Sequence, residues 1–170
     1  MRMAALAVLV LCCCLGVVTD AQSCQCSKRT PFLGTVAESD LVVRGEIDAY
    51  GERQARGVEV YESLVLRVKE TLRGSTESKK IVIRGGDGKN CVFEIYPRFF
   101  EAGGEYVFSV KSVDGADYTL QSCAESWLRI SEGIVRGAIA SEQQSTMTYE
   151  ELAIHVAGVA YQPESSRESQ

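Results

Sequence analysis

Four cysteines that follow an apolar leader constrain the fold of this chain more than any other feature. The chain has seven cysteines; three lie inside the leader, and the others are Cys24, Cys26, Cys91 and Cys123. An even number of cysteines in an exported chain predicts two disulfides. A bridge between Cys24 and Cys26 would close a strained small ring, so both remaining connectivities tie the N-terminal segment to two distant places. A four-cysteine zinc site is the less favoured alternative, because such sites usually contain paired Cys-x-x-Cys knuckles.

The first 23 residues are predicted to be a secretory signal peptide. Met1 to Met3 carry a positive charge, and the run from Ala4 to Val18 is apolar. This run is shorter than the ~20 residues that a membrane span needs, and it has the length of a signal-peptide core. We therefore expect secretion into the extracellular space, with no membrane attachment after cleavage. An uncleaved anchor and an acylated lipoprotein are less favoured alternatives.

The position of the cleavage site decides which residue begins the mature chain. Small residues at Ala21 and Ser23 favour a cut directly before Cys24. A cut after Ala21 is the alternative, and it would leave two residues ahead of Cys24. The favoured cut gives a mature chain that begins on a cysteine.

The mature chain is predicted to be a single acidic domain. Residues 24–161 are enough to build one hydrophobic core, and residues 162–170 form a polar tail that we expect to be disordered. The formal net charge is −5 and there is no basic run, which argues against nucleic acid and heparin as partners. We expect a monomer.

Most of the chain has the pattern of short strands separated by turns. In one of them Leu64, Leu66 and Val68 alternate with polar neighbours, as in a half-buried strand. Glycines and turn residues separate the segments, and Asp114-Gly115 is predicted to be the turn of a hairpin. Five or six strands at this spacing favour a small barrel or sandwich. The expected strands lie in residues 40–50, 58–72, 79–86, 91–96, 103–111 and 117–123.

Two helices are expected to bracket the strands. The first has Thr30 as its N-cap and Pro31 at its first helical position, and it runs to about Glu38. The second begins with a capping box over Thr148–Glu151 and ends near Gly158. The sequence therefore predicts a mainly β protein with a helix near each end.

No motif for catalysis is found in the sequence. The sequence contains no HExxH, GxSxG or P-loop motif. The glycine-rich residues 84–90 do not have the P-loop spacing of glycines and lysine, and no helix is expected to follow them. His155 is the only histidine, so we expect neither a histidine-rich metal site nor a serine or cysteine triad, and we interpret it as a surface or packing residue. Trp127 is interpreted as a core residue. By elimination we expect a secreted binding protein rather than an enzyme.

An N-terminal cysteine has a chemistry that an internal cysteine lacks. Its free α-amine has a pKa of about 7.7 to 8.0, so a useful fraction is neutral near pH 7. The amine nitrogen and the carbonyl oxygen of Cys24 can hold one metal in a five-membered chelate ring. A catalytic zinc keeps one coordination position open for water, which a rigidly held terminus could displace.

The segment CQCSKRTPFLGTVAESDLVVRG at residues 24–45 resembles the start of the tissue inhibitors of metalloproteinases. The likeness continues through Cys91, FFEAGGEYVFSV at 99–110 and CAESWLRIS at 123–131, and it covers residues 24–133. The resemblance implies a netrin-like module: an OB-fold five-stranded closed barrel with flanking α-helices. It also implies the disulfides Cys24–Cys91 and Cys26–Cys123.

In function, the resemblance implies a secreted inhibitor of zinc metalloproteases that has no cofactor of its own. The Cys24 amine and carbonyl would chelate the zinc of the target protease, and Gln25 would enter its S1′ pocket. Cys26, Ser27 and Lys28 would extend the contact along the cleft.

Residues 87–90, which include Lys89 and Asn90, would form the adjoining edge of the contact surface; the alternative for them is an ordinary connector. The sequence departs from the family at Gln25, where Thr or Ser is usual, and at Val36, where the family has a cysteine of a third disulfide. The alternative function is a non-inhibitory extracellular binding protein of the netrin type, in which the cysteines only stabilise the barrel.

Overall fold

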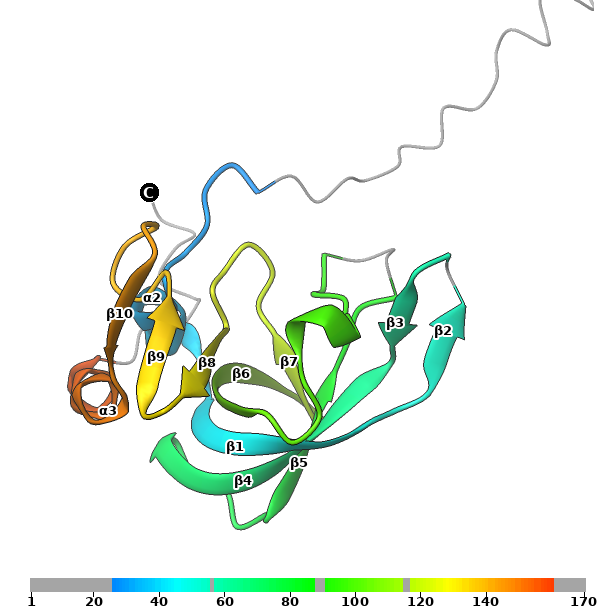
Figure 1. The fold of residues 1–170 in the computed structure, drawn as a ribbon, viewed down its shortest axis with the longest axis horizontal. Coiled ribbons are helices and arrows are strands. Elements are labelled where there is room, and N and C mark those ends of the chain that lie inside the picture. The colour runs from blue at the N-terminus through cyan, green and yellow to red at the C-terminus, as the bar shows by residue number, and fades with distance from the viewer. Residues whose placement is uncertain (1–25, 56, 88–90, 115–116, 161–170) are drawn as a thin grey trace, which may run out of the picture.

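The computed structural model describes residues 26–55, 57–87, 91–114 and 117–160 (Figure 1). The leader, Cys24, Gln25, Lys89, Asn90 and the tail at 162–170 lie outside the described residues. In chain order the elements are α2 (Phe32–Glu38), β1 (Leu41–Tyr50), β2 (Arg53–Ala55), β3 (Glu59–Tyr61), β4 (Ser63–Arg73), β5 (Lys80–Arg84), η1 (Pro97–Phe99), β6 (Glu105–Asp114), β7 (Asp117–Leu120), β8 (Trp127–Ser131), β9 (Ile134–Gly137), β10 (Ser145–Thr148) and α3 (Tyr149–Gly158). No helix among these residues is both long and apolar enough to span a bilayer.

Five strands close into a barrel, as the sequence predicts. The strand order is β1-β4-β5-β7-β6, and β6 pairs with β1 to close the ring. All neighbours are antiparallel except β5 and β7, which are parallel. The chain is therefore mainly β, with an OB-like barrel and two flanking helices.

The barrel interior is filled by the inward-facing side chains of its strands and by the segment that joins β5 to β6. Alternation along β4 places Leu64 and Leu66 inside, and Val68 packs against the same core, as expected. These side chains supply most of the hydrophobic stabilisation of the barrel, because their apolar surface is removed from water. The buried set is Leu41, Val43, Ile47, Leu64, Leu66, Ile81, Ile83, Ile95, Phe100, Tyr106, Phe108, Val110, Tyr118 and Leu120.

A second core lies outside the barrel wall, where the helices and β8 to β10 pack (Figure 1). Val42 of β1 and Val107 of β6 point outward into it, whereas their neighbours along each strand point into the barrel. Both strands are thus buried on two faces, which requires apolar residues in succession rather than simple alternation. The buried members are Phe32, Val36, Val42, Val107, Leu128, Ile130, Val135, Ile139, Tyr149, Leu152 and Val156.

The predicted cap of the first helix is wrong, whereas that of the second is confirmed. Pro31, not Thr30, occupies the N-cap of α2, and it makes no side-chain cap. A side-chain cap is dispensable because the N–H groups of Phe32 and Leu33 donate to the carbonyls of Ala138 and Ile139, at 2.8 and 3.0 Å. In α3, Thr148 and Glu151 form both hydrogen bonds of the expected capping box.

The expected strand at 91–96 does not form. Only Ile95 pairs, through an isolated bridge to Tyr61. The backbone there turns back on itself, since the N–H of Gly86 donates to the carbonyl of Phe93 at 2.8 Å. The expected strand at 58–72 is divided at Glu62 into β3, which pairs with β2, and β4, which pairs with β1. Strands β8, β9 and β10 were not predicted.

The glycine at position 45 allows the barrel to close. The β1–β4 register shifts between Arg44 and Gly45, where the other edge of β1 is paired with β6, and such a shift bends a strand. A Cβ at position 45 would lie 2.6 Å from the carbonyl oxygen of Arg67 and 2.7 Å from Cγ of Leu66. Only glycine permits this approach of the two backbones.

We expect Gly45→Ala to lower the free energy of unfolding by about 1–3 kcal/mol, because the added methyl group overpacks the wall between β1 and β4. Gly158→Ala is the matched control: no atom lies within 4 Å of a Cβ at that position. Urea denaturation should give the control a midpoint equal to or above that of the parent chain. Equal midpoints for both variants would contradict this account of the bend.

Candidate functional site

Three segments that are distant in sequence meet at one end of the barrel (Figure 1). They are residues 26–30 before α2, the described residues 85–87 and 91–95 after β5, and the connection 121–126 between β7 and β8. A disulfide joins Cys26 to Cys123, with their Cα atoms 5.3 Å apart. This confirms one of the two bridges that the resemblance implies.

Ser126, which is 2% exposed, holds together the two ends of the connection between β7 and β8, which we call its neck. Its hydroxyl donates to the carbonyl of Gln121 at 3.1 Å and accepts from the N–H of Gln121 at 3.2 Å. Beyond this neck Cys123 has a φ of +57°, in the left-handed region that non-glycine residues seldom adopt. The neck therefore holds Cys123 in a conformation that the isolated chain would rarely populate.

Residues 26–30 are tied to this connection by the backbone as well as by the disulfide. The N–H of Thr30 donates to Cys123 at 2.9 Å, and the carbonyl of Thr30 accepts from Glu125 at 2.8 Å. Arg29 forms an ion pair with Glu125 at 3.8 Å. Burial raises the pKa of Glu125, and Arg29 opposes the shift. The segment is thus fixed at Cys26 and again at Thr30.

Ser27 and Lys28, between these two fixed points, are exposed. The Lys28 side chain is 78% exposed and lies 3.6 Å from Glu142. Exposed ion pairs of this kind contribute little to stability, so Lys28 remains available to a partner. Of the predicted contact residues, Cys26, Ser27 and Lys28 therefore share one accessible strip, and Gln25 lies outside the described residues.

The loop after β5 reaches the same place through Cys91. Ser122 donates a hydrogen bond from its hydroxyl to the Cys91 carbonyl. Cys91 is itself disulfide-bonded, and Cys24, its expected partner, lies outside the described residues. The loop is narrow at its base, because a Cβ on Gly86 would lie 2.3 Å from the carbonyl oxygen of Val92.

A surface cavity of about 430 Å³ lies where the three segments meet. Its lining includes Lys28, Thr30, Cys91, Val92, Ser122 and Cys123. The predicted residues 26–28 and the Cys91 loop are thus brought to one place. Sequence reasoning missed Ser122, whose hydrogen bond reaches Cys91, 31 residues away. It also missed Ser126, because no local pattern around a serine signals its two bonds to the backbone of Gln121.

The described residues contain no group of three or more His, Cys, Asp or Glu side chains that could hold a metal ion. His155 is exposed on α3. Trp127 packs against the barrel core, as expected, with its ring centroid 4.9 Å from that of Phe100.

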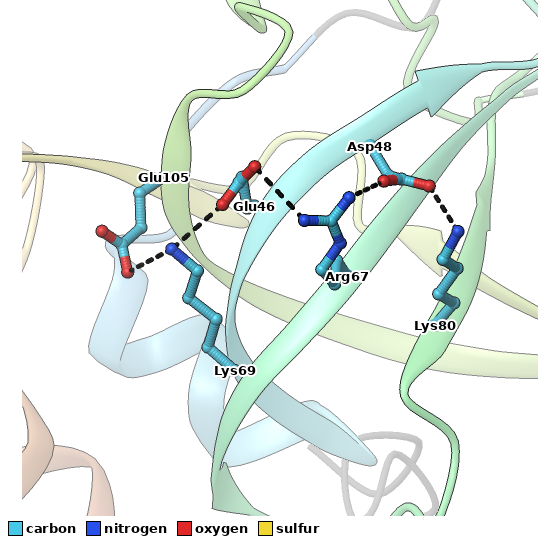
Figure 2. Close-up of polar contacts among 6 residues, drawn as sticks. All are labelled: Glu46, Asp48, Arg67, Lys69, Lys80 and Glu105. Atoms are coloured by element: carbon cyan, nitrogen blue, oxygen red, sulfur yellow. Dashed lines mark hydrogen bonds and ion pairs between the residues drawn. The ribbon is translucent and has the colours of Figure 1, made fainter.

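The outer face of β1, β4 and β5 carries a row of alternating charges (Figure 2). Arg67 forms ion pairs with Asp48 and Glu46, and Asp48 also accepts from Lys80 at 2.6 Å. Lys69 pairs with Glu46 at 3.1 Å and with Glu105 at 3.7 Å. Each cation of this row is matched by a carboxylate, so the face presents no bare basic surface and is a weak candidate for the functional site.

A scan against protein-family models and a search of curated proteins gave no match to this chain.

We predict that Cys24 pairs with Cys91, which would place both disulfides beside Ser122. Digestion without reduction, followed by mass spectrometry, should yield a peptide pair that joins Cys24 to Cys91 and another that joins Cys26 to Cys123. Each bridge closes a long loop and should stabilise the fold by about 4 to 5 kcal/mol in the chain-entropy description. Recovery of Cys24 as a free thiol would overturn the assignment.

We expect Asp48→Asn to destabilise the protein near pH 7 and to have little effect near pH 2. Lys80 and Arg67 hold the pKa of Asp48 below its usual value of 3.8, so the carboxylate stabilises the fold above that pH. This contribution is lost as the pH falls through the lowered pKa of the folded state. Urea midpoints at the two pH values test the difference, with Glu77→Gln, at an exposed position in the β4–β5 turn, as the control. A loss at pH 2 as large as at pH 7 would contradict it.

Proposed function

We propose that this protein is a secreted inhibitor of zinc metalloproteases and that its N-terminal Cys24 binds the zinc of the target. The observation that carries the proposal is the double attachment of residues 26–30. The Cys26–Cys123 disulfide and the backbone bridge at Thr30 fix this strip at one end of the barrel. Ser27 and Lys28 remain exposed between them.

Rigidity is what such an inhibitor needs from its own fold. A flexible terminus would lose conformational freedom on entering a protease cleft, and this loss would weaken binding. A segment held in advance by a disulfide and by hydrogen bonds avoids most of that cost. The proposed second disulfide at Cys24 would extend the same restraint to the first residue of the mature chain.

The proposed chemistry at Cys24 uses its two backbone groups. The neutral α-amine and the carbonyl oxygen would together occupy positions on the protease zinc that water otherwise holds. The amine is the titrating member, with an ordinary pKa of about 7.7 to 8.0. The target supplies the metal, and the inhibitor supplies ligands and geometry.

Neighbouring residues would set affinity and target choice. Gln25 would enter the S1′ pocket, where an amide without a hydrogen-bond partner costs about 1–3 kcal/mol. We therefore expect the best targets to be proteases whose S1′ pocket offers such a partner. Ser27, Lys28 and the 87–90 loop, which includes Lys89 and Asn90, would contact the rim of the cleft.

We expect one alanine added before Cys24 to abolish inhibition and to leave the fold intact. The added residue converts the amine to an amide, which is a poor metal ligand, and pushes extra atoms toward the zinc. Inhibition constants should rise by about 100-fold or more, equivalent to about 3 kcal/mol. Chains that begin at Cys24 and chains extended by alanine should be compared against a panel of matrix-type metalloproteases, with melting temperatures measured on both.

Two further measurements sharpen this test. The chain that begins at Gln22 should behave like the alanine extension, since it too lacks a free amine on Cys24. Inhibition by the chain that begins at Cys24 should weaken by up to about tenfold per unit as the pH falls below the amine pKa, because protons compete with zinc. Equal inhibition by extended and authentic chains would refute zinc chelation. Absence of inhibition by both, across the panel, would favour a non-inhibitory binding protein.

A further inference from the structure

A second surface, on the outer side of β8 and β9, has the composition of a binding site. These strands bury Leu128, Ile130 and Val135 against the helices. Because successive side chains point to opposite faces, Trp127, Arg129, Ser131, Ile134 and Arg136 share the other face. They line a hollow of about 720 Å³ together with Glu125, Glu132, Gly137 and Gln144.

Two arginines lie directly opposite each other across this face. Arg129 of β8 is paired in register with Arg136 of β9. Like charges in directly opposed positions destabilise a sheet, so this pair is a cost to the free protein. Arg129 is partly compensated by an exposed ion pair with Glu101. Arg136 has no ion-pair partner among the residues that the structure describes.

Two of the residues that line the hollow, Trp127 and Ile134, are large and apolar. The Trp127 ring contacts Phe100 and Tyr106, with centroids 4.9 and 6.0 Å away, and is only partly buried. Ile134 is 40% exposed and pairs with Ser131, so it lies beyond the Arg129–Arg136 pair from Trp127. Tryptophan and arginine together are the residues most often found at the energetic centre of protein interfaces.

The charges around the hollow limit what it can accept. Glu125 and Glu132 also line it, so a polyanion such as nucleic acid or a sulfated glycan would meet two carboxylates. A ligand with a single carboxylate avoids this repulsion and can still engage both guanidinium groups, which match carboxylate geometry. Trp127 and Ile134, on the two sides of the arginine pair, favour apolar groups on both sides of that carboxylate.

We propose that the hollow on β8 and β9 binds an extended peptide segment of a partner protein, in which one carboxylate is flanked by apolar side chains. Arg129 and Arg136 bind the carboxylate, and Trp127 and Ile134 contact the apolar side chains. In an extended peptide, side chains two positions apart share a face. The acidic residue should therefore have an apolar residue two positions before it and another two positions after it. The hollow adjoins the 26–30 segment at Glu125, which lines it and pairs with Arg29, but peptide binding here does not require zinc chelation by Cys24.

Trp127 is the only tryptophan in the chain, so its fluorescence reports on this hollow alone. The probe is the peptide acetyl-GLGDGLG-amide, and the control is acetyl-GLGNGLG-amide, which lacks the charge. We expect saturable fluorescence changes with the acidic peptide, with a Kd of about 1 mM or tighter, and weaker binding of the control. Binding should weaken at high salt, because the contact is between charges.

Arg136→Gln should weaken binding of the acidic peptide by about threefold or more. Arg53→Gln, on the β2–β3 hairpin, is the matched control and should bind as the parent chain does; its arginine is exposed and paired with Glu59 at 3.0 Å. The melting temperature of Arg136→Gln should equal or exceed that of the parent, because a repulsive pair is removed. No saturable binding, equal binding of both peptides, an unchanged Kd for Arg136→Gln, or tighter binding of a heparin fragment than of the peptide would each overturn the proposal.

Discussion

Strand β1 is hydrogen-bonded along both edges, to β4 and to β6, and this double pairing closes the barrel on which the rest of the structure depends. Closure leaves no free edge within the ring of five strands, so its backbone groups are satisfied internally. The strand is also buried on both faces, since Val42 packs under the helices while Leu41 and Val43 fill the interior. Gly45 makes the geometry possible by letting β1 approach β4 at the bend.

The closed barrel gives one end of the molecule a rigid base for otherwise irregular segments. Residues 26–30, the Cys91 loop and the 121–126 connection are not strands of the barrel, yet each is held by bonds to another. Ser122 and Ser126 contribute by satisfying backbone carbonyls at the two narrow points. A binding segment built this way combines loop-like accessibility with little conformational freedom, the combination that tight inhibition of an enzyme requires.

Arginine side chains on two faces of the molecule differ in whether their charge is paired with a carboxylate. On β4, Arg67 lies between two carboxylates, so its charge is neutralised within the fold (Figure 2). On β9, Arg136 faces another arginine across the sheet and is left without an ion-pair partner in the described part of the chain. The first arrangement stabilises the native state, whereas the second places like charges opposite each other, which in our proposal a carboxylate of a bound peptide would offset. The net charge of −5 averages over both faces and therefore does not indicate this difference between them.

The sequence by itself determined the features that depend on neighbours along the chain. These are the mainly β character, the β6–β7 hairpin, the inward face of β4 and the capping box of α3, whose Thr148 and Glu151 are three residues apart. The tertiary structure decided the features that depend on hydrogen bonds or contacts with residues far away in the sequence. It replaced the expected Thr30 cap by carbonyls of Ala138 and Ile139, and it left residues 91–96 without a ladder. It also brought Cys26 to Cys123 across 97 residues and set Arg129 against Arg136. Hydrogen bonds and packing between remote segments leave no periodic trace in either segment, so only the folded chain reveals them.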